Sequence, residues 1–134
     1  MKKNTNTVNQ WIFKAEHDYE AMHSLNTNAP ALTDSICMHA QQCAEKYIKA
    51  YYLSINKLFP FTHDLIKLLN ELDNDELLNH DVYKWADDID TFGILIRYPS
   101  INGDPTYQET KLIIDSRENI RRFFRKLLNN YLQQ

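Results

Sequence analysis

The stretch MHAQQCAEKYIKAYYL, from Met38 to Leu53, has the apolar spacing of a buried helix, yet it carries two adjacent glutamines, a glutamate and two lysines. Around this stretch, apolar side chains recur at three- and four-residue steps and share one arc of a helical wheel: Ile36, Ala40, Cys43, Ala44, Tyr47, Tyr51 and Ile55. A helix with one apolar face must bury it against other elements. We therefore predict a core helix that begins at Thr33 or Asp34 as N-cap and ends near Ile55.

The rest of the chain is also predicted to be helical. Two glycines and four prolines in 134 residues are few, and a sheet protein would need more tight turns. Periodicity places further helices at about residues 8–25, 63–72 and 76–96, and a last one after residue 106. Thr62 is the expected N-cap of the short helix, and Thr106 with Glu109 forms a capping box for the last one. The predicted fold is an all-α, antiparallel up-and-down bundle of four to five helices.

Length and composition limit the function classes. Residues 1–7 are expected to be a flexible N-terminus and residues 8–132 a single helical domain. The net charge of −3 does not call for a nucleic-acid or membrane partner. Cys37 and Cys43 lie ~9 Å apart along one helix axis, too far for a disulfide. Since the chain also shows no signal peptide and no bilayer-spanning run, we expect a cytoplasmic protein with reduced cysteines.

Charged residues interrupt two of the apolar arcs. Asp18 lies among the apolar positions of the first predicted helix, and Arg117 does so in the last one. A lone buried charge is costly, so each should have a partner. We expect Asp18 and Arg117 to meet, or one of them to meet Glu45 or Arg97. Asp18, Glu45 and Arg117 thus form a candidate buried polar cluster, which serves either as a core ion pair that sets helix register or as the floor of a ligand site.

A ridge of polar residues lies opposite the apolar arc of the core helix. Its members, here called the cationic ridge, are His39, Gln42, Lys46 and Lys49, and Gln41 and Glu45 flank it. The ridge could be a solvated face or a polar dimer interface. Alternatively it could bind phosphate, because Lys and Gln side chains supply hydrogen-bond donors without a competing negative charge.

The last helix carries a basic group near its C-terminus: Arg121, Arg122, Arg125 and Lys126. Positive charge at this end complements the helix dipole, and it can also pair with the acidic stretch 71–90. We favour this interpretation over an RNA-binding patch, because Phe123 and Phe124 are expected to face the core and cannot form a stacking platform.

Motifs of catalysis are scarce. His39 and Cys43 have the i,i+4 spacing of a metal-binding pair, but no second pair is evident, so no metal site is predicted. The two glycines are isolated and form no phosphate-binding loop. No serine or cysteine stands in a nucleophile motif. We predict no catalytic residue and no cofactor.

Three ordered segments, HAQQCAEKYIKAYYL, FTHDLIKLL and IRYP, resemble the HEPN domain family. The resemblance covers nearly the whole chain, including Trp11, Ala15 and Asp18 in the first helix. It implies a bundle of four or five helices that is commonly a homodimer and is linked to nucleotide binding. Such domains often act beside a minimal nucleotidyltransferase, in a two-component arrangement like that of toxin–antitoxin systems.

Several branches of that family are ribonucleases whose motif is an Arg, four to six residues and then a His. The positions required after Arg97 are occupied by Asn102, Gly103 and Asp104. Those required after Arg117 are occupied by Arg122, Phe123 and Phe124. The histidine needed for acid–base cleavage of RNA is thus missing from the motif, which argues against an enzyme.

Three function classes are compatible with the resemblance. The favoured one is a non-catalytic, nucleotide-associated module that contacts ATP or GTP through a candidate ligand-binding set: Gln42, Lys46, Lys49, His63 and Arg97. The alternatives are a metal-independent ribonuclease with a degenerate site around Arg97 and His63, and a subunit that only binds other proteins.

Overall fold

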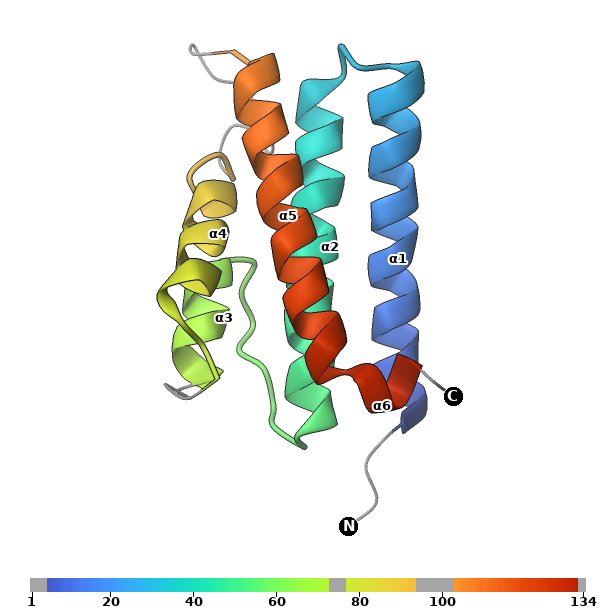
Figure 1. Cartoon of the computed structure of the whole chain (residues 1–134), viewed down its shortest axis with the longest axis vertical. Helices are drawn as coiled ribbons and strands as arrows, with labels where there is room; N and C mark the ends of the chain where they lie inside the picture. Colours follow the sequence, from blue (N-terminus) through green and yellow to red (C-terminus); the bar gives the residue numbers. More distant parts are fainter. Residues whose placement is uncertain (1–4, 73–76, 94–102, 133–134) are drawn as a thin grey trace.

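A computed structural model of the chain describes residues 5–72, 77–93 and 103–132. Within these ranges the elements are all helices (Figure 1): α1 (Thr5–Asn28), α2 (Thr33–Ser54), α3 (Leu65–Leu72), α4 (His80–Asp90), α5 (Tyr107–Leu127) and α6 (Asn129–Leu132). The long helix α2 packs against α1, α5 and α3, and α4 packs against α3 and α5. The predicted all-α bundle is confirmed. No helix in the described ranges has the length and apolar character needed to cross a bilayer.

The helix directions alternate except at one connection. Figure 1 shows α1 and α4 running opposite to α2, α3 and α5. Contacts agree: Cys37 of α2 lies against Thr110 of α5, and further along both helices Tyr51 lies against Phe124. α2 and α3 share a direction because residues 55–64 run back along α2 before α3 begins (Figure 1).

The core sits where α2 is enclosed by its neighbours. Apolar side chains that are at most 1% exposed come from α1 to α5, and they include Ala15, Met22, Ile36, Tyr47, Tyr52, Leu68, Val82, Ile89, Ile113 and Phe124. On α2 the burial extends beyond the predicted apolar arc, so that Gln41, Glu45 and Lys49 are buried as well. The polar groups of this helix therefore need partners inside the protein.

The predicted helix ends hold in part. The capping box is confirmed: the Glu109 N–H donates to Thr106 Oγ1 at 3.1 Å, and the Thr106 N–H donates to Glu109 Oε1 at 2.8 Å. The predicted N-cap of α2 is wrong, because Leu32 occupies that position without a side-chain hydrogen bond. The N-cap of α3 is Asp64 rather than Thr62, since its carboxylate accepts the Lys67 N–H at 3.1 Å.

Other boundaries shift by a turn or less. α1 begins at Thr5, so residues 5–7, expected to be part of a flexible end, are helical. α4 begins at His80 with Asn79 as its N-cap, one turn after the predicted start. The predicted part of this helix from residue 94 to Ile96 lies outside the described residues. The short α6 was not predicted as a separate helix.

Candidate functional site

The first polar cluster joins α1 to α2 around Asp18. Its carboxylate oxygens lie 2.9 Å from His39 Nδ1 and 2.5 Å from Lys46 Nζ. Asp18 is 9% exposed and thus buried, as predicted. Its predicted contact with Arg117 is wrong for the described residues, because the carboxylate turns toward α2, which packs directly against this face of α1.

The second polar cluster centres on Glu45, which is 3% exposed. Lys49 Nζ lies 2.9 Å from one carboxylate oxygen, and the other oxygen accepts from Gln41 Nε2 at 2.9 Å and faces His63 Nδ1 at 3.0 Å. Gln41 Nε2 also donates to the backbone carbonyl of His63 at 2.9 Å, and Gln42 Nε2 donates to Gln41 Oε1 at 2.7 Å. The cluster therefore ties the connection 55–64 to the middle of α2.

The hydrogen bonds set the charge of this second cluster. Burial acts to raise the pKa of Glu45, but hydrogen bonds from Lys49 and Gln41 outweigh it and hold that pKa below its ordinary value. Glu45 is therefore an anion at neutral pH, and it neutralises the buried ammonium of Lys49.

The lysines of the cationic ridge are not free to bind phosphate in the way that their spacing suggested. Lys49 is 7% exposed and paired with Glu45, and Lys46 is paired with Asp18. The helical wheel placed both lysines opposite the core, but α1, α3 and α5 cover α2 on several sides. Four residues of the candidate ligand-binding set are instead divided between the two clusters, and the fifth, Arg97, lies outside the described residues.

Lys46 does line a pocket beside α1. The pocket has a volume of about 400 Å³ and is formed by Gln10, Trp11, Lys14 and Lys46. The ring of Trp11 also meets Phe59 edge to face, with centroids 5.3 Å apart, and Lys49 Nζ lies 5.7 Å from its centroid. Of the predicted ligand contacts that the structure describes, Lys46 lines this pocket. Beside it is the ring of Trp11, which the sequence analysis did not name as a ligand contact.

Of the fully buried side chains that the structure describes, Arg117 is the largest, with 1% exposure. Its Nη1 lies 2.6 Å from Glu118 Oε1, and its guanidinium stacks over the Tyr19 ring with Cζ 4.8 Å from the ring centroid. Among the described residues its Nε has no hydrogen-bond partner. The predicted burial is correct, but the partner is the next residue of the same helix rather than Asp18 or Glu45.

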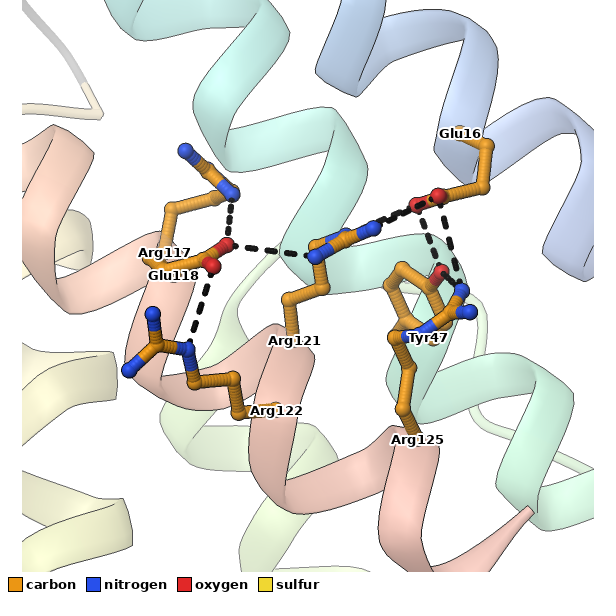
Figure 2. Close-up of polar contacts among 7 residues, drawn as sticks. All are labelled: Glu16, Tyr47, Arg117, Glu118, Arg121, Arg122 and Arg125. Carbon is orange, nitrogen blue, oxygen red and sulfur yellow. Dashed lines mark hydrogen bonds and ion pairs between the residues drawn. The ribbon is translucent and has the colours of Figure 1, made fainter. Parts of the chain in front are cut away.

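Glu16 organises a third polar network, shown in Figure 2, which the sequence did not reveal. Arg121 grips its carboxylate with Nε and Nη2 at 2.8 and 2.7 Å, and the Tyr47 hydroxyl donates to it at 2.6 Å. Arg125 Nη1 donates to the Tyr47 hydroxyl at 2.8 Å. Glu16 follows Ile12 by four residues and precedes Tyr19 by three, and this spacing within the apolar arc was the available signal.

The Glu16 network also corrects the expected partners of the basic group at the end of α5. In the described residues Arg121, Arg122 and Arg125 pair with Glu16 and Glu118, not with the stretch 71–90. Burial acts to raise the pKa of Glu16, but hydrogen bonds from Arg121 and Tyr47 outweigh it and lower that pKa. Beside this network lies a pocket of about 550 Å³, lined by Arg121, Arg122, Arg125, Lys126, Asn129 and Leu132.

A carboxylate pair joins α3 to α4. The Asp90 carboxylate accepts the backbone N–H groups of Leu65 and Ile66 at 3.1 and 2.9 Å, so a residue of α4 caps the start of α3. Burial and the adjacent carboxyl of Asp64 raise the pKa of Asp90 to about 7. This contact depends on the packing of α4 against α3 and has no local sequence signal.

Comparison with known proteins agrees with this architecture. The crystal structure of TT1696 from Thermus thermophilus superposes with a TM-score of 0.74 over 90% of this chain and 98% of that chain, at 23% sequence identity. At this identity the likeness shows the fold alone. No curated protein matches the sequence. The family model of the HEPN domain matches residues 8–127. By this match over most of its length, the chain belongs to the HEPN domain family.

Proposed function

We propose that the chain is a non-catalytic, nucleotide-binding HEPN module, and that the nucleotide binds in the pocket beside Trp11. The observation that carries the proposal is the lining of this pocket: an aromatic ring, an amide and two ammonium groups, from Trp11, Gln10, Lys14 and Lys46. Its volume of about 400 Å³ is in the range of small-molecule sites.

Each lining residue has a chemical counterpart in a nucleotide. An aromatic ring stacks on the face of any base. The amide of Gln10 offers both donors and an acceptor to a base edge or a sugar hydroxyl. Lys14 and Lys46 offer ammonium donors to phosphate oxygens, and the contact with Asp18 holds Lys46 in place.

The remaining predicted contacts have a supporting role in this proposal. Lys49 lies against the Trp11 and Phe59 rings, at 5.7 and 5.0 Å from their centroids, and so positions the aromatic wall. Gln42 and His63 belong to the Glu45 cluster, which anchors the connection that carries Phe59. We therefore assign the direct contacts to Gln10, Trp11, Lys14 and Lys46.

Fluorescence titration tests the site. Replacing the second tryptophan by Trp85→Phe leaves Trp11 as the only reporter. We expect ATP or GTP to quench it with saturation, and Lys14→Gln to weaken binding about tenfold, the loss of one charged contact. Lys111→Gln, an exposed lysine on α5, is the matched control and should bind as the parent does. Absence of both quenching and binding heat at millimolar nucleotide would remove the proposal.

For assembly we propose a homodimer, alone or beside a minimal nucleotidyltransferase in a toxin–antitoxin-like pair. The support is family membership. Sedimentation equilibrium should give about twice the chain mass of 15.9 kDa. A monomer at micromolar concentration, together with no complex when the product of an adjacent nucleotidyltransferase gene is co-expressed, would contradict this part of the proposal.

Metal-independent RNA cleavage is a second candidate, favoured by the contact between Glu45 and His63. The carboxylate accepts only, so His63 Nδ1 carries the proton there and Nε2 is left for acid–base chemistry. The side chain of His63 is 62% exposed and open to a substrate. Incubation with total RNA decides: cleavage that is lost in His63→Gln and Arg97→Ala but kept in His80→Ala would replace the non-catalytic proposal.

A further inference from the structure

We propose that the pocket at the junction of α5 and α6 is a second ligand site, which binds a chain of phosphate groups. The two sources of that chemistry are the triphosphate of a nucleotide and inorganic tripolyphosphate. The pocket has a volume of about 550 Å³ and is lined by Arg121, Arg122, Arg125, Lys126, Asn129 and Leu132. It shares no residue with the pocket beside Trp11, so this inference is independent of the proposed function.

Part of the basic group keeps donors that no described residue uses. Arg122 contacts Glu118 through Nε at 3.2 Å, so its two terminal nitrogens remain available to a ligand. Arg125 contacts Tyr47 and Glu16 through Nη1, so its Nε and Nη2 remain available to a ligand. Lys126 forms no ion pair with any residue in the described ranges. These groups together offer several N–H donors to oxyanions.

The network in Figure 2 holds the arginines before a ligand arrives. Arg121 is locked on Glu16 by two hydrogen bonds and stacks on Tyr19, with Cζ 4.0 Å from the ring centroid. Arg125 is held by the hydroxyl of Tyr47. A guanidinium that is already fixed loses less conformational entropy on binding than a free surface arginine.

The basic group exceeds what the helix itself requires. The C-terminus of a helix carries about half a negative charge, and the carboxylates of Glu16 and Glu118 add two more. Four cations of the described residues line the pocket, so the balance among these described groups is positive although the whole chain has a net charge of −3. A ligand with several negative charges within a few ångströms of each other complements this balance.

Single-stranded RNA fits the pocket less well than a compact phosphate chain. Binding of single strands relies on exposed aromatic rings for base stacking. Phe124 is fully buried, and Phe123 packs edge to face against it at a centroid distance of 5.2 Å. As far as the described residues form it, the pocket wall is thus made of cations, an amide and Leu132, without an exposed ring.

Calorimetric titration of the full chain at low salt tests the site. Tripolyphosphate, ATP and a single-stranded RNA are the three titrants. The site variant is Arg122→Gln with Lys126→Gln, and the control is Lys84→Gln with Lys111→Gln, which removes the same charge from exposed lysines of α4 and α5. We expect tripolyphosphate to bind and the site variant to weaken it about tenfold, while the control changes it less than twofold.

The arms separate the outcomes. If a nucleotide is the natural source, ATP binding falls in the site variant, and Lys14→Gln leaves tripolyphosphate binding unchanged. If only tripolyphosphate responds to the site variant, the source is inorganic. Equal weakening in site variant and control would show non-specific attraction and overturn the proposal. So would the absence of tripolyphosphate binding, or RNA binding that tripolyphosphate does not displace. Circular dichroism confirms that each variant is folded.

Discussion

At the residue scale, the buried carboxylates of Glu45 and Asp18 pair with lysines, one within a single helix and one across two helices. Glu45 pairs with Lys49 one turn further along α2, and Asp18 reaches across to Lys46. Each pair removes the cost of an isolated charge in the interior, but a buried pair is not by itself more stabilising than apolar side chains of the same size. The consequences can be measured at Glu45 and at Arg117.

Glu45→Ala should lower the free energy of unfolding by about 3 kcal/mol, because it leaves the buried ammonium of Lys49 without its carboxylate. Glu45→Leu combined with Lys49→Met should lose clearly less, since no charge then remains. Urea unfolding at pH 7 measures both. The control is Lys111→Ala, from an exposed i,i+4 pair, with an expected change below about 0.5 kcal/mol. A double variant less stable than Glu45→Ala would contradict the argument.

Arg117→Met should be neutral or stabilising by about 1 kcal/mol, since an apolar side chain of similar length removes a buried charge. The Arg117 side chain is 1% exposed, and its Nε has no hydrogen-bond partner among the described residues. Arg117→Ala has the same charge change but leaves a cavity, and it should destabilise the fold. Thermal and urea unfolding compare the two. Equal losses in both variants would show that the Arg117–Glu118 contact itself is needed.

At the element scale, the connection 55–64 and the start of α3 are held by side chains from other helices. Gln41 of α2 binds the backbone carbonyl of His63, and Asp90 of α4 accepts the first two N–H groups of α3. Short helices are marginal alone and depend on such tertiary contacts. The polar residues of the Met38–Leu53 stretch therefore position a loop and the helix that follows it, as well as lining a core.

The Asp64–Asp90 pair should make stability depend on pH. Since the pKa of Asp90 is raised in the folded state, its contribution to stability is complete below the unfolded value of about 4 and is lost as the pH rises toward 7. Asp64→Asn removes the neighbouring charge and should lower the pKa of Asp90 and flatten this loss. Carboxyl NMR titration and urea unfolding between pH 4.5 and 7.5 measure both effects. Asp81→Asn, exposed on α4, is the control. An unchanged titration of Asp90 in Asp64→Asn would refute the coupling.

At the scale of the whole molecule, α1, α2 and α5 are joined by Glu16 and its partners Arg121, Arg125 and Tyr47. Two carboxylates with lowered pKa values, Glu16 and Glu45, link the helices that enclose the core. Protonation of these two carboxylates in acid would therefore remove ion pairs that hold the helices together.

Acid should therefore weaken the bundle. Glu16 and Glu45 have folded pKa values below their unfolded ones, so their stabilisation is present above the unfolded value of about 4.3 and disappears as the pH falls through the folded values. We expect Glu16→Gln to be less stable than the parent at pH 6 but to lose less on acidification to pH 2.5. Glu20→Gln, exposed on α1, should follow the parent. Parallel acid profiles for the parent and Glu16→Gln would contradict the assignment.

The sequence by itself determined the helical class, the approximate position of the long helices, the capping box at Thr106 and the family resemblance. These features depend on period, on local hydrogen bonds and on ordered residue identities, which a chain displays without its fold. It also indicated that Asp18, Glu45 and Arg117 would be buried, because each sits on or beside an apolar arc.

Only the tertiary structure decided which charges meet and where pockets form. Asp18 and Arg117 take different partners, Glu16 gathers arginines from more than a hundred residues away in sequence, and Asp90 caps a helix to which it does not belong. The helical wheel describes one helix in isolation, whereas α2 is enclosed by three. Side-chain partners are set by helix packing and by the returning connection, and neither leaves a local signal in the sequence.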